Sequence, residues 1–250
     1  MASGGRQPPD KGVSLDRAEL RSTLANRLGA VEGRLRAACR RADRLRDDVT
    51  LVAVTKTAPV EAAAVLGELG VRDLGENRPQ ELWRKAAALP PTVRWHLIGH
   101  LQRNKIEQTL PLVHCIHSAD SLRLLAALEE EAARQGRTID VLLQVNASRE
   151  ASKQGFAPEE VPGLAPTLLG LKRVRVTGLM TMAAYEEEPQ RCRPTFVMLR
   201  ELRDRLRAVV GPVHPLTELS MGMTNDFEVA VEEGATLVRI GTALFEGMAS

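Results

Sequence analysis

The chain of 250 residues has few aromatic side chains, which make up 3% of the sequence. This fraction is too small for a row of stacking rings that would bind single-stranded nucleic acid. Its 34 basic and 32 acidic residues leave a net charge of +2, so neither sign of charge prevails. We therefore expect no electrostatic attraction to nucleic acid or to a membrane surface.

Cysteine is also scarce. Cys39, Cys115 and Cys192 lie far apart and are odd in number, which argues against a disulfide framework and a CxxC zinc site. No run of 18 apolar residues occurs, so we expect no membrane span. Residues 1–14 are polar, without an apolar central segment, and predict a disordered start rather than a signal peptide. These absences favour a cytoplasmic protein.

Several common signatures are missing as well. The sequence has no GxGxxG after an apolar run, no GxxxxGKS/T loop, no HExxH and no GxSxG. Dinucleotide binding, P-loop phosphoryl transfer, zinc proteolysis and serine hydrolysis therefore lose most of their support.

A long amphipathic helix is predicted over residues 15–46. Apolar residues recur there at spacings of three and four, which places them on one stripe. Arginines and acids are interspersed on the other faces. This pattern favours a solvated helix with ion pairs over a face that binds nucleic acid.

After this helix, eight short apolar runs alternate with amphipathic stretches. The alternation predicts parallel βαβ units and an α/β fold. Eight such units predict a single (β/α)8 TIM barrel domain over residues 15–250 with an extra long N-terminal helix; an open doubly wound sheet is the alternative. The expected strands are 49–55, 71–74, 93–98, 112–116, 139–145, 174–180, 216–220 and 236–240, and the expected helices are 59–69, 78–88, 102–109, 120–135, 158–168, 189–210 and 225–233.

Polar residues gather where the predicted strands end, and this end of a barrel carries the chemistry. Lys56 directly follows the first strand. Partial burial there would favour its neutral amine, which could attack an aldehyde; a solvent-reaching lysine is the alternative. Asn77 follows the second strand and either faces the barrel mouth or caps the helix near Pro79.

Two further candidates have ordinary explanations. His96 and His100 lie on a strand and in a turn, so their spacing does not bring them to one face and gives little support to a metal site. Met180 ends the sixth strand, where a methionine more often fills the core than lines a site.

The segments after the seventh and eighth strands are rich in small and hydroxyl residues. Ser220, Met221 and Gly222 belong to the first of them, and Gly241 and Thr242 open a helix in the second. In TIM barrels these two loops and the helix N-terminus form a common phosphate site.

Arg239 lies inside the apolar eighth strand and needs a partner, because an unpaired charge is costly to bury. A structural ion pair would explain it. One ligand, however, accounts for all these features: pyridoxal 5′-phosphate (PLP) has an aldehyde for Lys56, a phosphate for Ser220 and for Gly241–Thr242, and a ring nitrogen for Arg239.

The residues at these positions resemble the pyridoxal phosphate homeostasis protein family (the YggS/PROSC group), over about residues 50–250 and in the same order. The resemblance implies a barrel similar to the N-terminal domain of alanine racemase, bound PLP, and a role in vitamin B6 homeostasis. It implies a carrier that buffers PLP or supplies it to apo PLP-dependent enzymes, with no well-established catalytic reaction. The matching segments are Val54–Thr57, Gly75–Asn77, His96–Lys105, Gly178–Met182, Ser220–Asp226 and Val238–Phe245.

Carried over by position, Lys56 would form a Schiff base with PLP, and Arg239 would face its pyridine nitrogen. The resemblance assigns the remaining cofactor contacts to Ser220, Gly241 and Thr242 at the phosphate, to the backbone of Met221 and Gly222, to Asn77 against the ring, and to His96 and Met180 along the pocket.

The sequence departs from the family pattern at two places. Thr55 stands where the family often has serine and keeps a hydroxyl. Glu246 follows Phe245 where the family usually has glycine, so the resemblance does not predict the conformation of the last turn of the chain.

An amino-acid racemase of the alanine racemase type is the alternative function. A racemase needs an acid or base on each face of the α-carbon, and in alanine racemase the second is a tyrosine from an added β-domain of a neighbouring subunit. The one tyrosine here, Tyr185, lies among glutamates. Arg239 would also leave the ring nitrogen unprotonated, which weakens it as an electron sink. We therefore expect a carrier, as a monomer or weak dimer.

Overall fold

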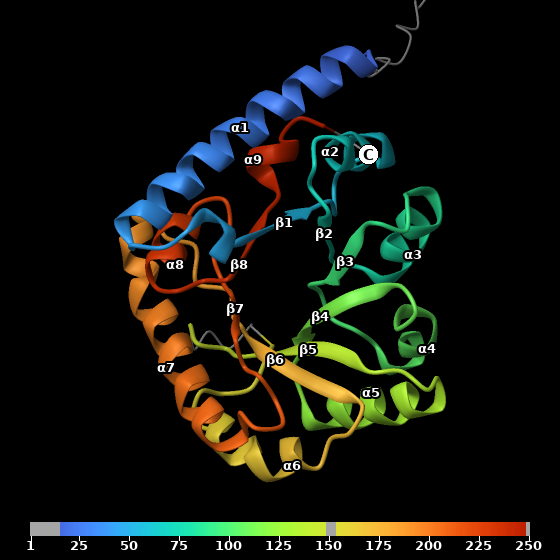
Figure 1. Ribbon diagram of the computed structural model, residues 1–250, viewed down its shortest axis with the longest axis vertical. Helices are drawn as coiled ribbons and strands as arrows, with labels where there is room; N and C mark the ends of the chain where they lie inside the picture. The colour runs from blue at the N-terminus through green and yellow to red at the C-terminus, as the bar shows by residue number, and fades with distance from the viewer. Residues whose placement is uncertain (1–15, 149–153, 249–250) are drawn as a thin grey trace, which may run out of the picture.

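The computed structural model describes residues 16–148 and 154–248. Eight parallel strands close into a barrel in sequence order, with β8 paired to β1 (Figure 1). The TIM barrel is therefore confirmed and the open sheet is excluded, while the expected disordered start lies outside the described residues. The strands are β1 Thr50–Val54, β2 Asp73–Glu76, β3 Arg94–Leu97, β4 Val113–Ala119, β5 Ile139–Gln144, β6 Val174–Met180, β7 Glu218–Ser220 and β8 Leu237–Ile240.

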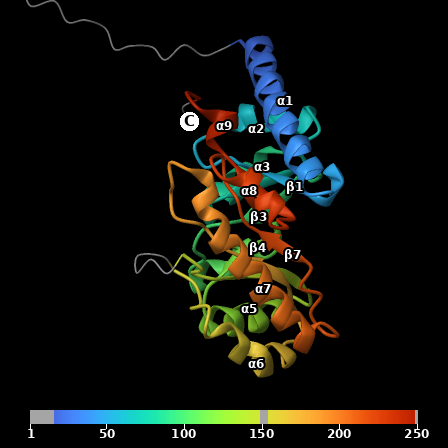
Figure 2. The same ribbon diagram turned by 90° about the vertical axis from the view of Figure 1, so that its left-hand side faces the viewer.

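A helix follows each strand and lies on the outside of the barrel (Figures 1 and 2). Within residues 16–148 and 154–248, none of the helices is long and apolar enough to cross a membrane. The helices are α1 Arg17–Arg41, α2 Val60–Glu68, α3 Pro79–Ala88, α4 Ile106–Thr109, α5 Leu122–Arg134, α6 Ala165–Leu169, α7 Arg193–Val210, α8 Phe227–Glu232 and α9 Thr242–Phe245.

The N-terminal helix α1 completes the outer ring of helices. The helix after β8, α9, is a single turn and covers little of the barrel, whereas α1 packs against α8, α2 and α9 (Figure 1). Its buried stripe contains Leu24, Val31 and Leu35. On the other faces, arginines pair with acids of α2 and α8, as in the contact of Arg34 with Glu228 at 2.7 Å. The predicted ion-paired helix is confirmed.

Helix α1 ends at Arg41, five residues before the expected boundary at residue 46. Asp43 adopts a left-handed backbone with φ of 52°, and the N–H of Arg44 donates to the carbonyl of Cys39. A left-handed residue of this kind commonly terminates a helix.

Strand β4 continues three residues beyond its expected end at residue 116. Its extension is stabilised by pairing with β5, because Ala119 lies opposite Leu143. The segment His117–Ala119, which is polar at its start, therefore belongs to the barrel wall, and His117 is fully buried.

The interior of the barrel holds an apolar cluster next to polar side chains. Val52, Leu142, Met180 and Leu237 pack together with Cys115. The polar residues of the interior are as well buried as the apolar ones, and they include Asp73, His96, His117, Ser220 and Arg239. Buried polar groups require hydrogen-bond partners. The polar side chains of the interior therefore restrict the arrangement of their neighbours more than the apolar side chains do.

We predict that the packing of α1 contributes substantially to the free energy of unfolding. Leu35→Ala removes a fully buried side chain from the face toward the barrel and should cost about 2–5 kcal/mol in urea unfolding. The exposed neighbour Arg36 provides the matched control, and Arg36→Ala should change stability little. Equal losses for the two variants would contradict the structural role of α1.

Candidate functional site

The predicted site residues converge on one arc of the barrel rim. β8 pairs with both β7 and β1, and β1 pairs with β2, so the carboxyl ends of these four strands are neighbours. Met180, at the end of β6, lies opposite Ser220 in the sheet. The residues gathered in this way are Ser220, Met221 and Gly222 at β7, Gly241 and Thr242 after β8, Lys56 after β1, and Asn77 after β2.

Arg239 is 4% exposed, and its guanidinium is held by hydrogen bonds rather than by an ion pair. Nη1 donates to Oγ of Ser220 at 2.5 Å, and Nη2 donates to the carbonyl of Thr181 at 2.8 Å. Burial lowers the pKa of Arg239 to about 10, against the attraction of Asp226, so the side chain stays protonated near neutral pH. Further guanidinium N–H groups remain as donors.

Ser220 bonds to two side chains inside the barrel. Its hydroxyl lies 2.9 Å from Nδ1 of His117 and accepts the bond from Arg239. Both contacts are inside the barrel and the residue is fully buried. The hydroxyl of Ser220 is thus engaged with Arg239 and His117, and its contact with the phosphate stays a prediction.

Backbone N–H groups at the ends of β7 and β8 supply the donors for an anion. Among the described residues, the N–H groups of Gly222, Gly241 and Thr242 make no hydrogen bond within the protein. Gly222 is buried. Helix α9 is a single turn, so the expected helix dipole contributes little, and the individual N–H groups replace it.

The loop after β7 has a fixed shape. Gly222 has φ of +92°, and an added Cβ would lie 2.6 Å from Cβ of Ala230, so only glycine fits. The buried carboxylate of Asp226 accepts from the N–H of Met223 at 2.6 Å. Burial raises the pKa of Asp226, against the hydrogen bond from Met223 and the attraction of Arg239.

Lys56 directly follows Thr55 and is exposed, which corrects the expected partial burial. The backbone before it is fixed from below, because the fully buried Lys85 donates to the carbonyl of Thr55 at 2.5 Å and to Oε1 of Glu76 at 2.6 Å. The hydroxyl of Thr55 also donates to Glu76, at 2.6 Å. Serine carries the same hydroxyl, so the replacement of the family's usual serine by Thr55 keeps a group that can make this hydrogen bond.

Asn77 is exposed at the mouth and does not cap α3, whose N-cap residue is Arg78. Its side chain lies against Gly99, where an added Cβ would come within 2.6 Å of Oδ1 of Asn77. Asn77 therefore keeps its place on the rim because Gly99 leaves room for it.

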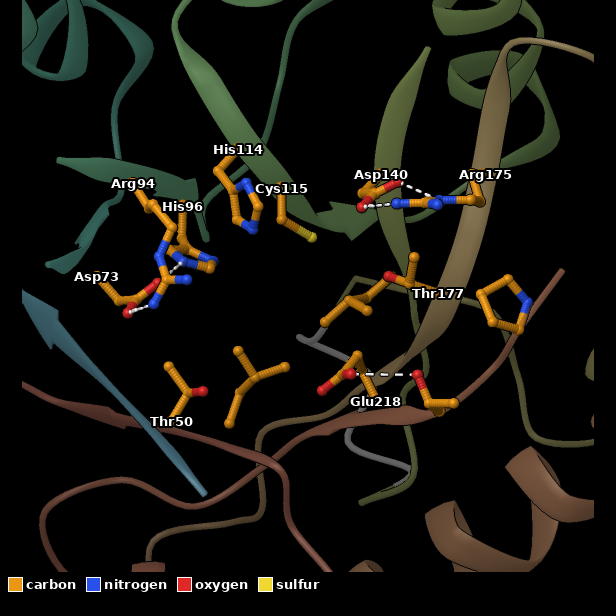
Figure 3. Close-up of a pocket in the computed structure, with 14 residues that line it drawn as sticks. Thr50, Asp73, Arg94, His96, His114, Cys115, Asp140, Arg175, Thr177 and Glu218 are labelled. Atoms are coloured by element: carbon orange, nitrogen blue, oxygen red, sulfur yellow. Dashed lines mark hydrogen bonds and ion pairs between the residues drawn. The ribbon is translucent and has the colours of Figure 1, made fainter. Parts of the chain in front are cut away.

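His96 and Met180 lie deeper in the barrel than the expected pocket wall. His96 bonds to Asp73 and His117 and lines a cavity of about 290 Å³ at the amino-terminal ends of the strands (Figure 3). Met180 is fully buried in the apolar cluster of the interior. Their contacts along the cofactor pocket stay a prediction.

The departure at Glu246 is accommodated without loss of the final turn. Phe245 is buried, Glu246 is exposed, and Gly247 adopts a positive φ of 74° one residue later than in the expected pattern. Arg27 of α1 donates to the carbonyl of Glu246 at 2.8 Å and ties the turn to the helix ring.

Sequence reasoning missed the residues that support the site from inside. Asp73 and His117 lie in apolar runs or at their ends, and nothing in the spacing indicates that they meet. Lys85 has a usable signal, because it takes an inward position of α3 together with Leu82. A lysine within an apolar stripe predicts a buried partner, which here is Glu76.

The profile of the alanine racemase N-terminal domain matches residues 27–248. Proteins named pyridoxal phosphate homeostasis protein from Aquifex aeolicus and Pseudomonas aeruginosa are 43% and 41% identical, over 88% and 90% of this chain and 96% and 95% of theirs. PipY of Synechococcus elongatus, solved with PLP bound, is 34% identical with a TM-score of 0.77, over 89% of this chain and 99% of PipY. Alanine racemase of Clostridium difficile, at 17% identity and a TM-score of 0.73 over 90% of this chain and 56% of that one, shows the fold alone.

We predict that the Lys85–Glu76 pair is essential for stability. Lys85→Met leaves the buried carboxylate of Glu76 without its counter-charge, so unfolding in urea should show a loss of about 3–5 kcal/mol. Adding Glu76→Gln removes the uncompensated charge and should recover part of this loss. Lys172→Met, at an exposed position, is the control. A double variant less stable than Lys85→Met would contradict the assignment.

Proposed function

The chain belongs to the pyridoxal phosphate homeostasis protein family, and we propose that it binds PLP at the carboxyl-terminal mouth of the barrel and carries it for other proteins. The observation that carries this proposal is the joint placement of an exposed lysine, a buried donor-only arginine and unpaired backbone N–H groups on one arc of the rim. PipY, a relative of similar length, was solved with PLP bound.

The chemistry of these donors fits the cofactor. The N–H groups of Gly222, Gly241 and Thr242 match a phosphate, which only accepts hydrogen bonds. The spare N–H groups of Arg239 match an unprotonated pyridine nitrogen, which also only accepts. The amine of Lys56 is the remaining group on this arc that can form a covalent bond with an aldehyde.

When bound, PLP supplies an aldehyde that condenses with an amine and releases one water. Different residues of the protein would hold different parts of PLP. Lys56 provides the amine, Arg239 faces the ring nitrogen, and Asn77 lies against the ring. The backbone N–H groups of Gly222, Gly241 and Thr242 would hold the phosphate, whereas the N–H of Met221 already donates to the carbonyl of Leu237 at 3.1 Å.

A carrier fits these residues better than a racemase. Arg239 donates to the ring nitrogen without protonating it, so the ring withdraws electrons weakly. Tyr185, the tyrosine that would be the candidate for a second acid or base, is 83% exposed. The recipients we propose are apo PLP-dependent enzymes in the cytoplasm, with the carrier acting as a monomer or weak dimer.

We predict that Lys56 is the covalent anchor. Protein incubated with PLP and reduced with borohydride should carry the label on the peptide that contains Lys56, and Lys56→Ala should abolish it. Lys105→Ala, in the neighbouring loop, is the control and should leave labelling intact. Label that moves to Lys105, or that persists in Lys56→Ala, would exclude this anchor.

We also predict transfer of PLP without turnover of amino acids. Protein loaded with PLP should reactivate an apo PLP-dependent enzyme faster than an equal amount of free PLP, released from the loaded protein by dilution, does. Chiral analysis of L-alanine, L-serine and L-lysine should show racemisation far below typical enzyme rates of roughly 1–10³ s⁻¹, because the missing second acid or base costs about 10²–10⁴-fold. Turnover at enzyme rates would favour a racemase, and transfer no faster than dilution would reduce the protein to passive storage.

A further inference from the structure

A continuous series of hydrogen bonds crosses the barrel from the amino-terminal cavity to Arg239. Oδ1 of Asp73 lies 2.9 Å from Nε2 of His96, and Nδ1 of His96 lies 2.9 Å from Nε2 of His117. Nδ1 of His117 lies 2.9 Å from Oγ of Ser220, which accepts from Arg239 at 2.5 Å. Every member is at least nine-tenths buried. We call these five residues the interior relay.

The two ends of the interior relay fix the direction of every bond in it. A guanidinium can only donate and an ionised carboxylate can only accept. Ser220 therefore donates its proton to Nδ1 of His117. His117 donates from Nε2 to His96, and His96 donates from Nε2 to Asp73. This assignment places the ring proton of each histidine on Nε2.

The surroundings support these charge states. Burial, reinforced by the positive charge of Arg239, lowers the pKa of His117 well below its usual value, so this histidine stays neutral. Burial would raise the pKa of Asp73, but hydrogen bonds from His96 and Arg94 outweigh it and lower the pKa. Asp73 thus remains a carboxylate, paired on its other side with Arg94 (Figure 3).

The reverse direction would leave a buried group unsatisfied. If His117 carried its proton on Nδ1, it would donate to Ser220, whose oxygen already accepts from Arg239. The hydroxyl proton of Ser220 would then lose its acceptor, and a buried donor without an acceptor is costly. The protonation of the histidines and the position of Arg239 are therefore coupled.

A metal centre is the other arrangement that these residues permit. Sγ of Cys115 and ring nitrogens of His96 and His117 lie within 4.8 Å of one another. A metal would need the thiolate, whereas burial and the nearby Asp140 and Glu218 raise the pKa of Cys115. Both nitrogens of each histidine are also already engaged. The hydrogen-bonded arrangement is the one in which all groups are satisfied.

We propose that Asp73, His96, His117 and Ser220 are positioning residues, which hold Arg239 so that its spare N–H groups point at the ring nitrogen of bound PLP. This inference rests on the proposed function. It makes the electronic state of the cofactor depend on residues from the opposite end of the barrel. The hydroxyl of Ser220 and the carbonyl of Thr181 fix two guanidinium nitrogens, and this restricts how the group can rotate.

The first test uses the cofactor-free protein, so it does not depend on PLP binding. Nitrogen-15 spectra of the histidine side chains at about pH 7 distinguish the two neutral tautomers. We expect His96 and His117 in the Nε2–H form, with coupling across the bond that joins them. An Nδ1–H tautomer at His117, or a positive charge on it, would overturn the direction of the relay.

The second test follows the ring nitrogen of nitrogen-15-labelled PLP bound to the full chain. His117→Phe interrupts the relay, so the ring-nitrogen signal should move downfield, toward that of a pyridine without a hydrogen-bond donor. His117→Gln offers an acceptor and a donor at similar spacing and should restore the signal. The matched control is His214→Gln, which alters a buried histidine that bonds to Leu168 and Val176 instead. It should leave the ring-nitrogen signal unchanged.

Each result has one meaning. A signal that stays unchanged in folded His117→Phe would overturn the positioning role, as would equal shifts in His117→Phe and His214→Gln. If His117→Phe does not fold, Asp73→Asn removes the terminal charge and should shift the signal in the same direction by a smaller amount; no shift there overturns the proposal. Absence of PLP binding by the wild-type chain would contradict the proposed function, while the histidine tautomers would still test the relay.

Discussion

The burial of one guanidinium inside a closed barrel constrains much of the surrounding structure. Water is excluded there, so the N–H groups of Arg239 must be met by protein or by ligand. Thr181 after β6 and Ser220 at the end of β7 meet two of them, and the carbonyl of Gly222 accepts the backbone N–H of Arg239 at 3.0 Å. Three contacts thus tie the ends of two strands, β6 and β7, to β8. The same tie places the phosphate loops, because Gly222 belongs to one of them and Gly241 follows Arg239 by two residues.

The site combines a rigid floor with an accessible rim. Below the rim, Lys85 and Glu76 fix the carbonyl of Thr55, so the backbone that carries Lys56 has little freedom. The amine of Lys56 itself is exposed. A covalent bond at an exposed amine can be reached by water or by a competing amine, which suits reversible release. In the proposed function, the buried residues would provide affinity and orientation for PLP, whereas the exposed Lys56 would allow its exchange.

The sequence predicted the barrel well because strand burial is a local property that appears as apolar runs, and because parallel βαβ units permit few topologies. It also placed the candidate site residues after strands that prove to be neighbours in the barrel. The sequence did not predict the contacts between side chains inside the barrel. β4 was expected to end at residue 116, because polar residues follow, so His117 was left in a loop. The partners of Ser220 and His96 depend on which side chains the closed sheet brings together, and one sequence does not contain those distances. Lys56 was expected to be partly buried because it would point into the barrel mouth, but its side chain is exposed.

The polarity of the interior relay bears directly on the choice between carrying and catalysis. Every proton in it is donated away from Arg239 and toward Asp73, so the relay has no proton to deliver to the ring nitrogen. Arg239 itself remains protonated near neutral pH, because its lowered pKa of about 10 is still well above that range. A pyridine nitrogen facing it stays an acceptor and withdraws electrons weakly, which slows bond cleavage at the α-carbon of an amino acid. In the proposed function, the network that fixes the arginine would therefore also weaken the cofactor as an electron sink, which suits a carrier of a reactive aldehyde better than an enzyme.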